Sequence, residues 1–233
     1  MLSQEIRTFP GELQHLPYCL RRSPRRRSLA LRVSDTGKIV VNAPQRLAQK
    51  DIDRFLQTHT EWVEARLAQA RANLFEWRDG AQLPWQGGHL SLSFQPVVGK
   101  PVLRLEADRL LCPAPADAAA ELVTKWYQQQ ARVLLTERLA IHATRAGLPL
   151  PPLRLTNART RWGSLSPKGV VSLNWRLIKA SPEQLDYVVC HELAHFRQRN
   201  HSPLFWREVG ALFPDYARVR SQLRSAGRRY FEF

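Results

Sequence analysis

The sequence predicts an α+β protein, in which helices and sheets are segregated along the chain, and three observations indicate this class. Short runs with strand-like alternation fill most of residues 16–112, interrupted by one helical pattern at 48–72. A long helical pattern then covers about 117–146, and short strands and further helices follow it. The segment Pro113-Ala114-Pro115-Ala116 lies between the two halves. We therefore expect a small β-rich N-terminal subdomain with one helix at 1–113 and a second domain at 114–233.

The elements of the N-terminal half follow from alternation and turns. Residues 16–42 are predicted to form a β-hairpin, because alternating apolar residues precede the turn Ser34-Asp35-Thr36-Gly37 and the apolar run Ile39-Val40-Val41 follows it. Apolar residues at helical spacing predict the helix at 48–72. His59 lies on that apolar face, which favours a packed histidine over a metal ligand. Residues 76–112 contain further short strands separated by glycine turns.

The C-terminal half is predicted to be mainly helical around a small sheet. Its long helix ends at Gly147, a residue type common directly after a helix. Strands are expected at 153–156 and 169–175. The next helix begins after Ser181, because Ser181-Pro182-Glu183-Gln184 combines an N-cap serine, a first-turn proline and a capping-box glutamine. Shorter helices are expected at 203–213 and from 215 to about 226.

This capped helix carries the most informative motif of the chain, His191-Glu192-Leu193-Ala194-His195. Residues four apart share one helix face, so both imidazoles can bind one ion. His201 follows in the turn Asn200-His201-Ser202-Pro203, where the chain can bring back a third ligand. Three neutral imidazoles suit Zn²⁺ and leave a fourth position for water, whose proton Glu192 can accept. The motif predicts one zinc ion per chain and metal-assisted hydrolysis. The alternative is a surface helix whose His and Glu side chains only titrate.

The composition is that of an ordinary soluble globular protein with a strong positive charge. No apolar run is long enough to span a bilayer, and the first ten residues lack the apolar segment of a secretory signal. Three widely spaced cysteines make no disulfide framework, which favours a cytoplasmic protein. The formal net charge is +15, and arginines cluster at 21–32 and 197–229. These clusters are either a solvated surface without a partner or a site for an anionic ligand or nucleic acid.

Motifs beyond the histidines show a family resemblance. In chain order they are Arg161-Trp162-Gly163-Ser164, Leu173-Asn174-Trp175-Arg176-Leu177-Ile178, the run from Tyr187 to His195, the run from Asn200 to Trp206, and Pro214-Asp215-Tyr216. In this order and spacing the sequence resembles the YgjP-like metallopeptidase family, a bacterial relative of SprT-type and minimal gluzincin-like zinc peptidases, over about 20–230. The resemblance implies a zincin-like metallopeptidase domain at 114–233, with a long helix, a small sheet, the H-E-x-x-H helix and C-terminal helices.

The resemblance also implies roles for individual residues. His191, His195 and His201 would be the zinc ligands, and Glu192 would be the general base. The family usually reads R-W-G-S-C-S where this chain has Leu165, so a cysteine there is not essential to this chain's chemistry unless the chain is impaired.

Three further residues are candidates for substrate binding or for stabilising the oxyanion: Arg161, Ser164 and Tyr216. A buried structural ion pair is the alternative role for Arg161. Helix capping around Asp215 is the commoner role for a position such as Tyr216.

The sequence leaves three functions open. The first is a zinc-dependent metallopeptidase acting on a peptide or protein substrate. The second is a metal-dependent nucleotide phosphohydrolase that uses the same zinc site with arginines as phosphate clamps, although the chain lacks a Walker A loop. The third is a nucleic-acid-associated SprT-like protease or binding module, whose binding would be nonspecific. No membrane association is expected, and the sequence does not predict the oligomeric state.

Overall fold

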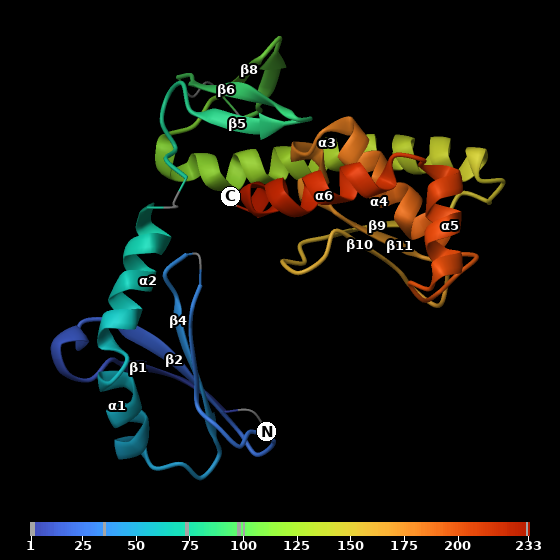
Figure 1. The fold of residues 1–233 in the computed structure, drawn as a ribbon. Coiled ribbons are helices and arrows are strands. Elements are labelled where there is room, and N and C mark those ends of the chain that lie inside the picture. The colour runs from blue at the N-terminus through green and yellow to red at the C-terminus, as the bar shows by residue number, and fades with distance from the viewer. Residues whose placement is uncertain (1–2, 35, 73–74, 97–98, 100, 232) are drawn as a thin grey trace. The chain divides into compact units, whose positions relative to one another are not determined.

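The α+β class predicted from the sequence is confirmed in the computed structural model, which describes residues 3–34, 36–72, 75–96, 99, 101–231 and 233 (Figure 1). Contacts within the chain divide it into two compact units, Met1–Phe75 and Glu76–Phe233. Each unit has its own sheets and helices and is described by itself.

The first unit is one sheet covered by helices. Its elements are β1 (Ser3–Thr8), the short 3₁₀ helix η1 (Gly11–Leu13), β2 (Pro17–Ser23), β3 (Ala30–Val33), β4 (Ile39–Pro44), α1 (Gln49–Gln57) and α2 (Thr60–Ala72). The strand order is β1-β2-β4-β3, and β2 runs parallel to β4. The predicted hairpin at 16–42 is therefore only partly right, because the hairpin is β3–β4 and β2 lies on the other side of β4. The sequence missed β1, a polar edge strand whose one large apolar residue, Ile6, is 80% exposed.

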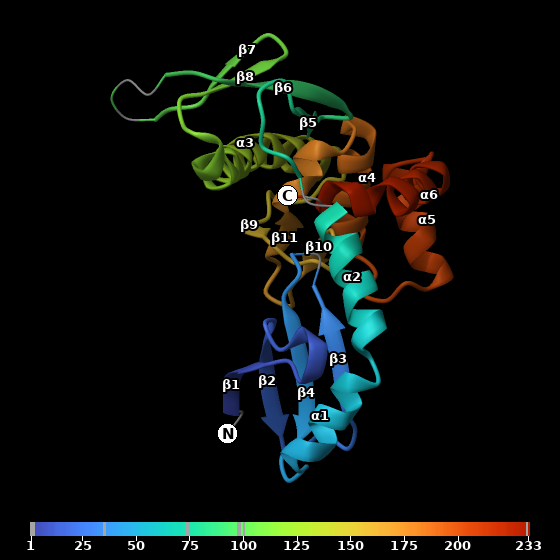
Figure 2. The same cartoon turned by 90° about the vertical axis from the view of Figure 1, so that its left-hand side faces the viewer.

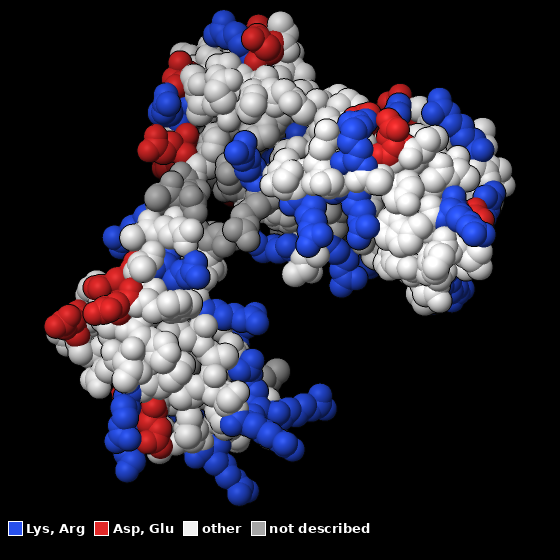
Figure 3. Space-filling model, in the orientation of Figure 1, with Lys and Arg blue, Asp and Glu red and all other residues white. Residues whose placement is uncertain are grey.

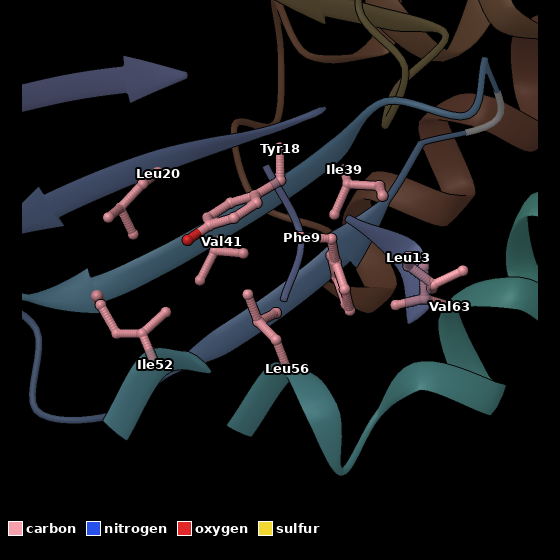
Figure 4. Packing of buried hydrophobic residues seen from close by; sticks show 10 residues of the cluster. Phe9, Leu13, Tyr18, Leu20, Ile39, Val41, Ile52, Leu56 and Val63 are labelled. Carbon is pink, nitrogen blue, oxygen red and sulfur yellow. The ribbon is translucent and has the colours of Figure 1, made fainter. Parts of the chain in front are cut away.

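The core of this unit lies between the sheet and its helices. Apolar side chains from β2 and β4 meet Ile52 and Leu56 of α1 and Val63 of α2 (Figure 4). The helix predicted at 48–72 is interrupted at Thr58, whose hydroxyl donates to the carbonyl of Phe55 (2.9 Å). His59 stacks on Phe55, as expected for a packed histidine. The interruption went unpredicted because the apolar spacing continues across it.

The second unit holds the histidine motif. Its elements are β5 (Gln82–Trp85), β6 (Gly88–Phe94), β7 (Arg104–Glu106), β8 (Arg109–Cys112), α3 (Ala116–Arg145), β9 (Leu153–Thr156), β10 (Gly163–Leu165), β11 (Val171–Asn174), the 3₁₀ helix η2 (Trp175–Lys179), α4 (Pro182–Ala194), α5 (Pro203–Leu212), α6 (Tyr216–Ala226) and the 3₁₀ helix η3 (Gly227–Phe231). One sheet has the order β5-β6-β8-β7 and the other β10-β11-β9. Helix α3 runs between these two sheets (Figure 2).

The division into units differs from the boundary expected after Pro113. The β5–β8 sheet belongs with the C-terminal helices, because the Tyr127 hydroxyl of α3 donates to the carbonyl of Pro84 (2.7 Å) and the amide of Gln86 donates to the carbonyl of Ile178 (2.8 Å). Trp85 also packs on Trp126. The proline-rich segment therefore starts a helix inside one unit, with Pro115 as the N-cap of α3.

A buried polar network joins α3 to α4. Arg138 of α3 makes two hydrogen bonds to the carboxylate of Asp186, and His142 Nε2 lies 3.2 Å from Asp186 Oδ1. His142 Nδ1 in turn lies 3.3 Å from Cys190 Sγ. Burial raises the pKa of Cys190 to about 12, so this side chain is a neutral thiol and the network is structural.

Replacing Asp186 by Asn should lower the free energy of unfolding at pH 7 by about 1–3 kcal/mol, because Arg138 loses a charged partner. Burial alone would raise the pKa of Asp186, but the hydrogen bonds from His142 and Arg138 hold it below its usual value. Such a carboxylate stabilises the fold above its unfolded pKa of about 4 and loses this contribution as the pH falls through its folded pKa. Urea unfolding of metal-free protein should show the difference between wild type and variant shrinking towards pH 3. A difference independent of pH, or an equal loss in the exposed control Asp108→Asn, would contradict this assignment.

Candidate metal centre

The helix that carries the histidine motif is fixed at its start by a capping box. The amide of Gln184 donates to Ser181 Oγ and the amide of Ser181 donates to Gln184 Oε1, both at 3.3 Å. Leu185, Val189 and Leu193 then bury one side of α4 in the unit's core. The helix predicted from Ser181 onward is thereby confirmed, and it places His191 and His195 one turn apart on the same face.

The third histidine is brought back by a turn. The chain leaves α4 and enters α5 at Ser202, whose hydroxyl accepts a hydrogen bond from the amide of Phe205 (3.4 Å). His201 directly precedes this cap, and its Nε2 lies 3.1 Å from Nε2 of His191. One ligand atom from each of His191, His195 and His201 lies within 4.8 Å of the others.

The histidine nitrogens fit a tetrahedral metal ion. Nitrogens bound to zinc at about 2.0–2.1 Å are separated by about 3.3 Å in a tetrahedron, close to the distance between His191 and His201. Nδ1 of His195 lies 3.0 Å from the carbonyl oxygen of Gln198, which can accept its proton and leave Nε2 with a free lone pair. Within the described residues, the group of three or more His, Cys, Asp or Glu side chains that could hold one metal ion consists of His191, His195 and His201.

The surroundings of His191 and His195 favour the neutral imidazole, the form that metal ligands need. Burial, with the nearby His195, His201 and Arg220, lowers the pKa of His191 to about 3. Burial likewise lowers the pKa of His195, although the hydrogen bond to Gln198 opposes it. Phe205 stacks on His195 with ring centres 4.5 Å apart. The cluster therefore has an apolar wall on one side, while His201 is exposed to solvent.

Glu192 is held beside this cluster in a tight pocket. Its side chain is only 4% exposed, and burial raises its pKa to about 8, against the opposing effects of the Arg161 charge and of a hydrogen bond from the Leu165 amide. Gly163 of β10 makes room for it, because a methyl group there would lie 2.7 Å from Cδ of Glu192. The backbone of β10, from Gly163 to Leu165, thus forms a cradle for the carboxyl group.

Comparison with known proteins places the chain in a family. The sequence model described as YgjP-like, metallopeptidase domain, matches residues 27–226. The chain belongs to the YgjP-like metallopeptidase family. Family membership implies a divalent metal and a peptide or protein substrate. No curated protein matches the chain. In the part of the chain that the structure describes, no helix is long and apolar enough to cross a membrane.

Two solved structures are similar to part of the chain. The metallopeptidase zymogen abylysin of Pyrococcus abyssi is 25% identical, with a TM-score of 0.36 over 39% of this chain and 92% of its own. The metallopeptidase zymogen jannalysin of Methanocaldococcus jannaschii is 18% identical, with a TM-score of 0.36 over 39% of this chain and 94% of its own.

The cradle explains how a YgjP-like protein tolerates leucine at position 165. The contact to Glu192 comes from the backbone amide of Leu165, which any residue except proline would supply. Successive side chains of a strand point to opposite faces, so Ser164 faces away from the side on which Gly163 meets Glu192. The charge of Arg161 acts on Glu192.

Tyr216 is linked to the histidine cluster through Trp206. Its ring stacks on Trp206 with centres 5.4 Å apart, and Trp206 in turn stacks on His201 at 5.9 Å. Arg220 lies over the Trp206 ring at 4.5 Å and contributes to the electrostatics of His191. Sequence reasoning gave no role to Gly163, Trp206 or Arg220. Gly163 and Trp206 lie within the family motifs, and Arg220 does not. The contacts of all three residues join segments that are distant in the sequence, so the sequence alone contains no signal for their roles.

Replacing Gly163 by Ala in this YgjP-like protein should lower kcat/KM for peptide hydrolysis by about 10- to 100-fold, because the new methyl group must displace the Glu192 carboxyl group or β10. Metal binding should be unchanged, since the histidines lie on α4 and the turn that follows it. Gly88→Ala on β6 is the matched control, because its new methyl group would make only an ordinary contact, 3.6 Å from the carbonyl oxygen of Trp85. Full activity in Gly163→Ala would show that the close contact between position 163 and Glu192 does not limit catalysis, and would contradict this account.

Proposed function

We propose that this metallopeptidase hydrolyses peptide bonds with one zinc ion held by His191, His195 and His201 and with Glu192 as the general base. The observation that carries the proposal is the cluster itself. Three imidazoles offer ligand atoms within 4.8 Å of one another, and the next residue after His191 is a buried carboxyl group of raised pKa. Such an arrangement supports metal-assisted hydrolysis.

The roles of the chain's own groups follow from their surroundings. When bound, zinc would acidify a water molecule and polarise the substrate carbonyl. Glu192 accepts a proton from the attacking water and delivers it to the leaving amine, the role of a general base and then of a general acid. The Leu165 amide and Gly163 fix the direction in which this carboxyl group points.

A substrate strand has a place to bind beside this carboxyl group. In the sheet order β10-β11-β9, β10 is an edge strand that pairs with β11 on one side. Its other edge offers backbone donors and acceptors to an extended peptide, which binds such an edge without much choice of sequence. Because β10 also cradles Glu192, a peptide paired with it would pass close to the general base.

Hydrolysis of an unfolded protein compared with hydrolysis of nucleoside triphosphates tests the proposal against a phosphohydrolase. Zinc-loaded protein should degrade casein and leave the triphosphates intact. Phosphate release without peptide cleavage would overturn the peptidase assignment. Within the described residues there is no second group of potential ligands for a two-metal phosphate site.

A further inference from the structure

A pocket of about 250 Å³ lies in the second unit, between the loop before β10 and the C-terminal helices. Its lining combines arginines with apolar side chains: Arg159, Thr160, Arg161, Trp162, Leu223, Arg224, Gly227 and Phe231. None of the described residues that line it is acidic. The volume suits one side chain or terminal group rather than a large ligand.

The arginines make this pocket strongly attractive to a carboxylate. Arg161 and Arg224 are exposed, so each can turn its guanidinium towards a ligand. Among the described residues, neither Arg161 nor Arg224 forms an ion pair within 4 Å with an acidic side chain. A guanidinium binds a carboxylate through two parallel hydrogen bonds, which are stronger than those between neutral groups. Lys and Arg side chains predominate on the face seen in Figure 3, and the net charge of +15 draws anions to the protein as a whole.

The loop that carries Arg159 and Arg161 is held in place by hydrogen bonds from Asn174 and by packing of Trp162. Asn174 is fully buried, and its Nδ2 donates to the carbonyl of Arg161 (3.3 Å) while its amide donates to the carbonyl of Trp162 (2.8 Å). The Trp162 ring packs on Phe231 of η3 with centres 4.9 Å apart. The backbone and floor of the pocket are therefore formed before a ligand arrives, which reduces the entropy lost on binding.

The pocket also lies close to the reacting bond. Trp162 lines it, and the next residue, Gly163, contacts the Glu192 carboxyl group. Arg161 precedes Gly163 by two residues in the chain, so the pocket adjoins the segment that contacts the general base. The charge of Arg161 acts on Glu192, which agrees with this short separation.

We propose that this arginine pocket is a substrate subsite for a carboxylate, close to the bond that is cut. This inference rests on the proposed peptidase function. The carboxylate belongs either to an acidic side chain of the substrate or to its C-terminus. Trp162, Leu223 and Phe231 contact the methylene groups that lead to the carboxylate, while the arginines bind its oxygens. The enzyme thus prefers acidic segments, a choice that strand pairing alone does not provide.

Paired peptides that differ only in Glu or Gln test the subsite. In one series, the Glu or Gln occupies in turn each of the three positions on either side of a fixed cleavage site, and both peptides of a pair have amidated C-termini. In a further peptide, a free C-terminus takes the place of the Glu side chain as the source of the carboxylate. In wild type, kcat/KM should be at least about 10-fold higher for the Glu peptide than for the Gln peptide at one position. The peptide with the free C-terminus shows whether a terminal carboxylate is the preferred ligand instead of an acidic side chain. In Arg224→Ala the ratio should fall to about 1–3, and Arg224→Lys should restore part of it.

The controls separate this subsite from general charge and from the peptidase function. Arg132→Ala removes one exposed arginine from α3, outside the pocket, and should keep the wild-type ratio. Equal cleavage of Glu and Gln peptides by wild type would overturn the subsite and leave the peptidase function intact, whereas no cleavage of any peptide would remove that function itself. The subsite is also wrong if Arg132→Ala lowers the ratio as much as Arg224→Ala does. Arg224-dependent binding of a single-stranded oligonucleotide without any Glu preference would assign the pocket to a polyanion instead.

Discussion

Glu192→Gln is expected to lower kcat/KM for peptide hydrolysis by about 10²- to 10⁴-fold, the usual contribution of a general base, while the bound metal stays at the wild-type level. The amide keeps the size of the side chain, so Gly163 still accommodates it, but it cannot accept a proton from water. Because the wild-type carboxyl group is buried with a raised pKa, the uncharged amide should be tolerated without loss of folding stability. Steady-state kinetics with a fluorogenic peptide and metal analysis of the same samples measure both effects.

The matched control is Glu183→Gln on the same helix. Glu183 is exposed at the start of α4 and pairs with Arg218, and such an exposed ion pair contributes little to stability. This variant should keep wild-type kinetics. If Glu192→Gln cleaves peptides at the normal rate while holding its metal, another group takes the proton and the assignment of Glu192 fails.

His195→Ala should abolish detectable peptide hydrolysis and weaken zinc binding by at least about 100-fold. Loss of an outer-shell partner already weakens metal binding by about 10- to 100-fold, and the loss of a direct ligand costs more. The helix should remain folded, since His195 is the C-cap of α4 and the buried stripe of that helix lies elsewhere. Equilibrium dialysis against a zinc buffer and far-UV circular dichroism separate loss of metal from loss of structure.

His89→Ala provides the control for His195→Ala. His89 lies exposed on β6 and is not part of the three-histidine cluster. It should bind zinc and cleave peptide as the wild type does. A His195→Ala protein that still carries one tightly bound zinc ion would show that the metal site does not include this histidine.

The centre of the site was predictable from sequence because its determinants are local. The capping box at Ser181 and Gln184 begins a helix, and the spacing of His191 and His195 puts both on one face whatever surrounds them. The turn before α5 is likewise encoded by Ser202 and Pro203, and it delivers His201 to the cluster. The local signals were sufficient for the three histidines to be named together.

The supporting contacts were not predictable because they join distant segments. Nothing in the local sequence distinguishes Gly163 from other glycines. Its role depends on Glu192 of α4, which leaves no room for a side chain at position 163. Arg161 and Arg224 share a pocket only because η3 and α6 close on the loop before β10. The same reason explains why the compact units divide at a different place from the expected boundary, since the packing of β5 on α3 through Pro84 and Tyr127 has no signature in either segment alone.

The most direct test of the three-histidine site is a zinc titration of metal-free protein in which bound metal and peptide hydrolysis are measured together. We expect activity to rise in proportion to bound zinc and to reach its plateau at one zinc ion per chain, with no such rise in His195→Ala. Peptide hydrolysis that persists in the fully chelated protein, or a plateau of bound zinc that brings no hydrolysis, would contradict the proposal that His191, His195, His201 and Glu192 form the catalytic centre.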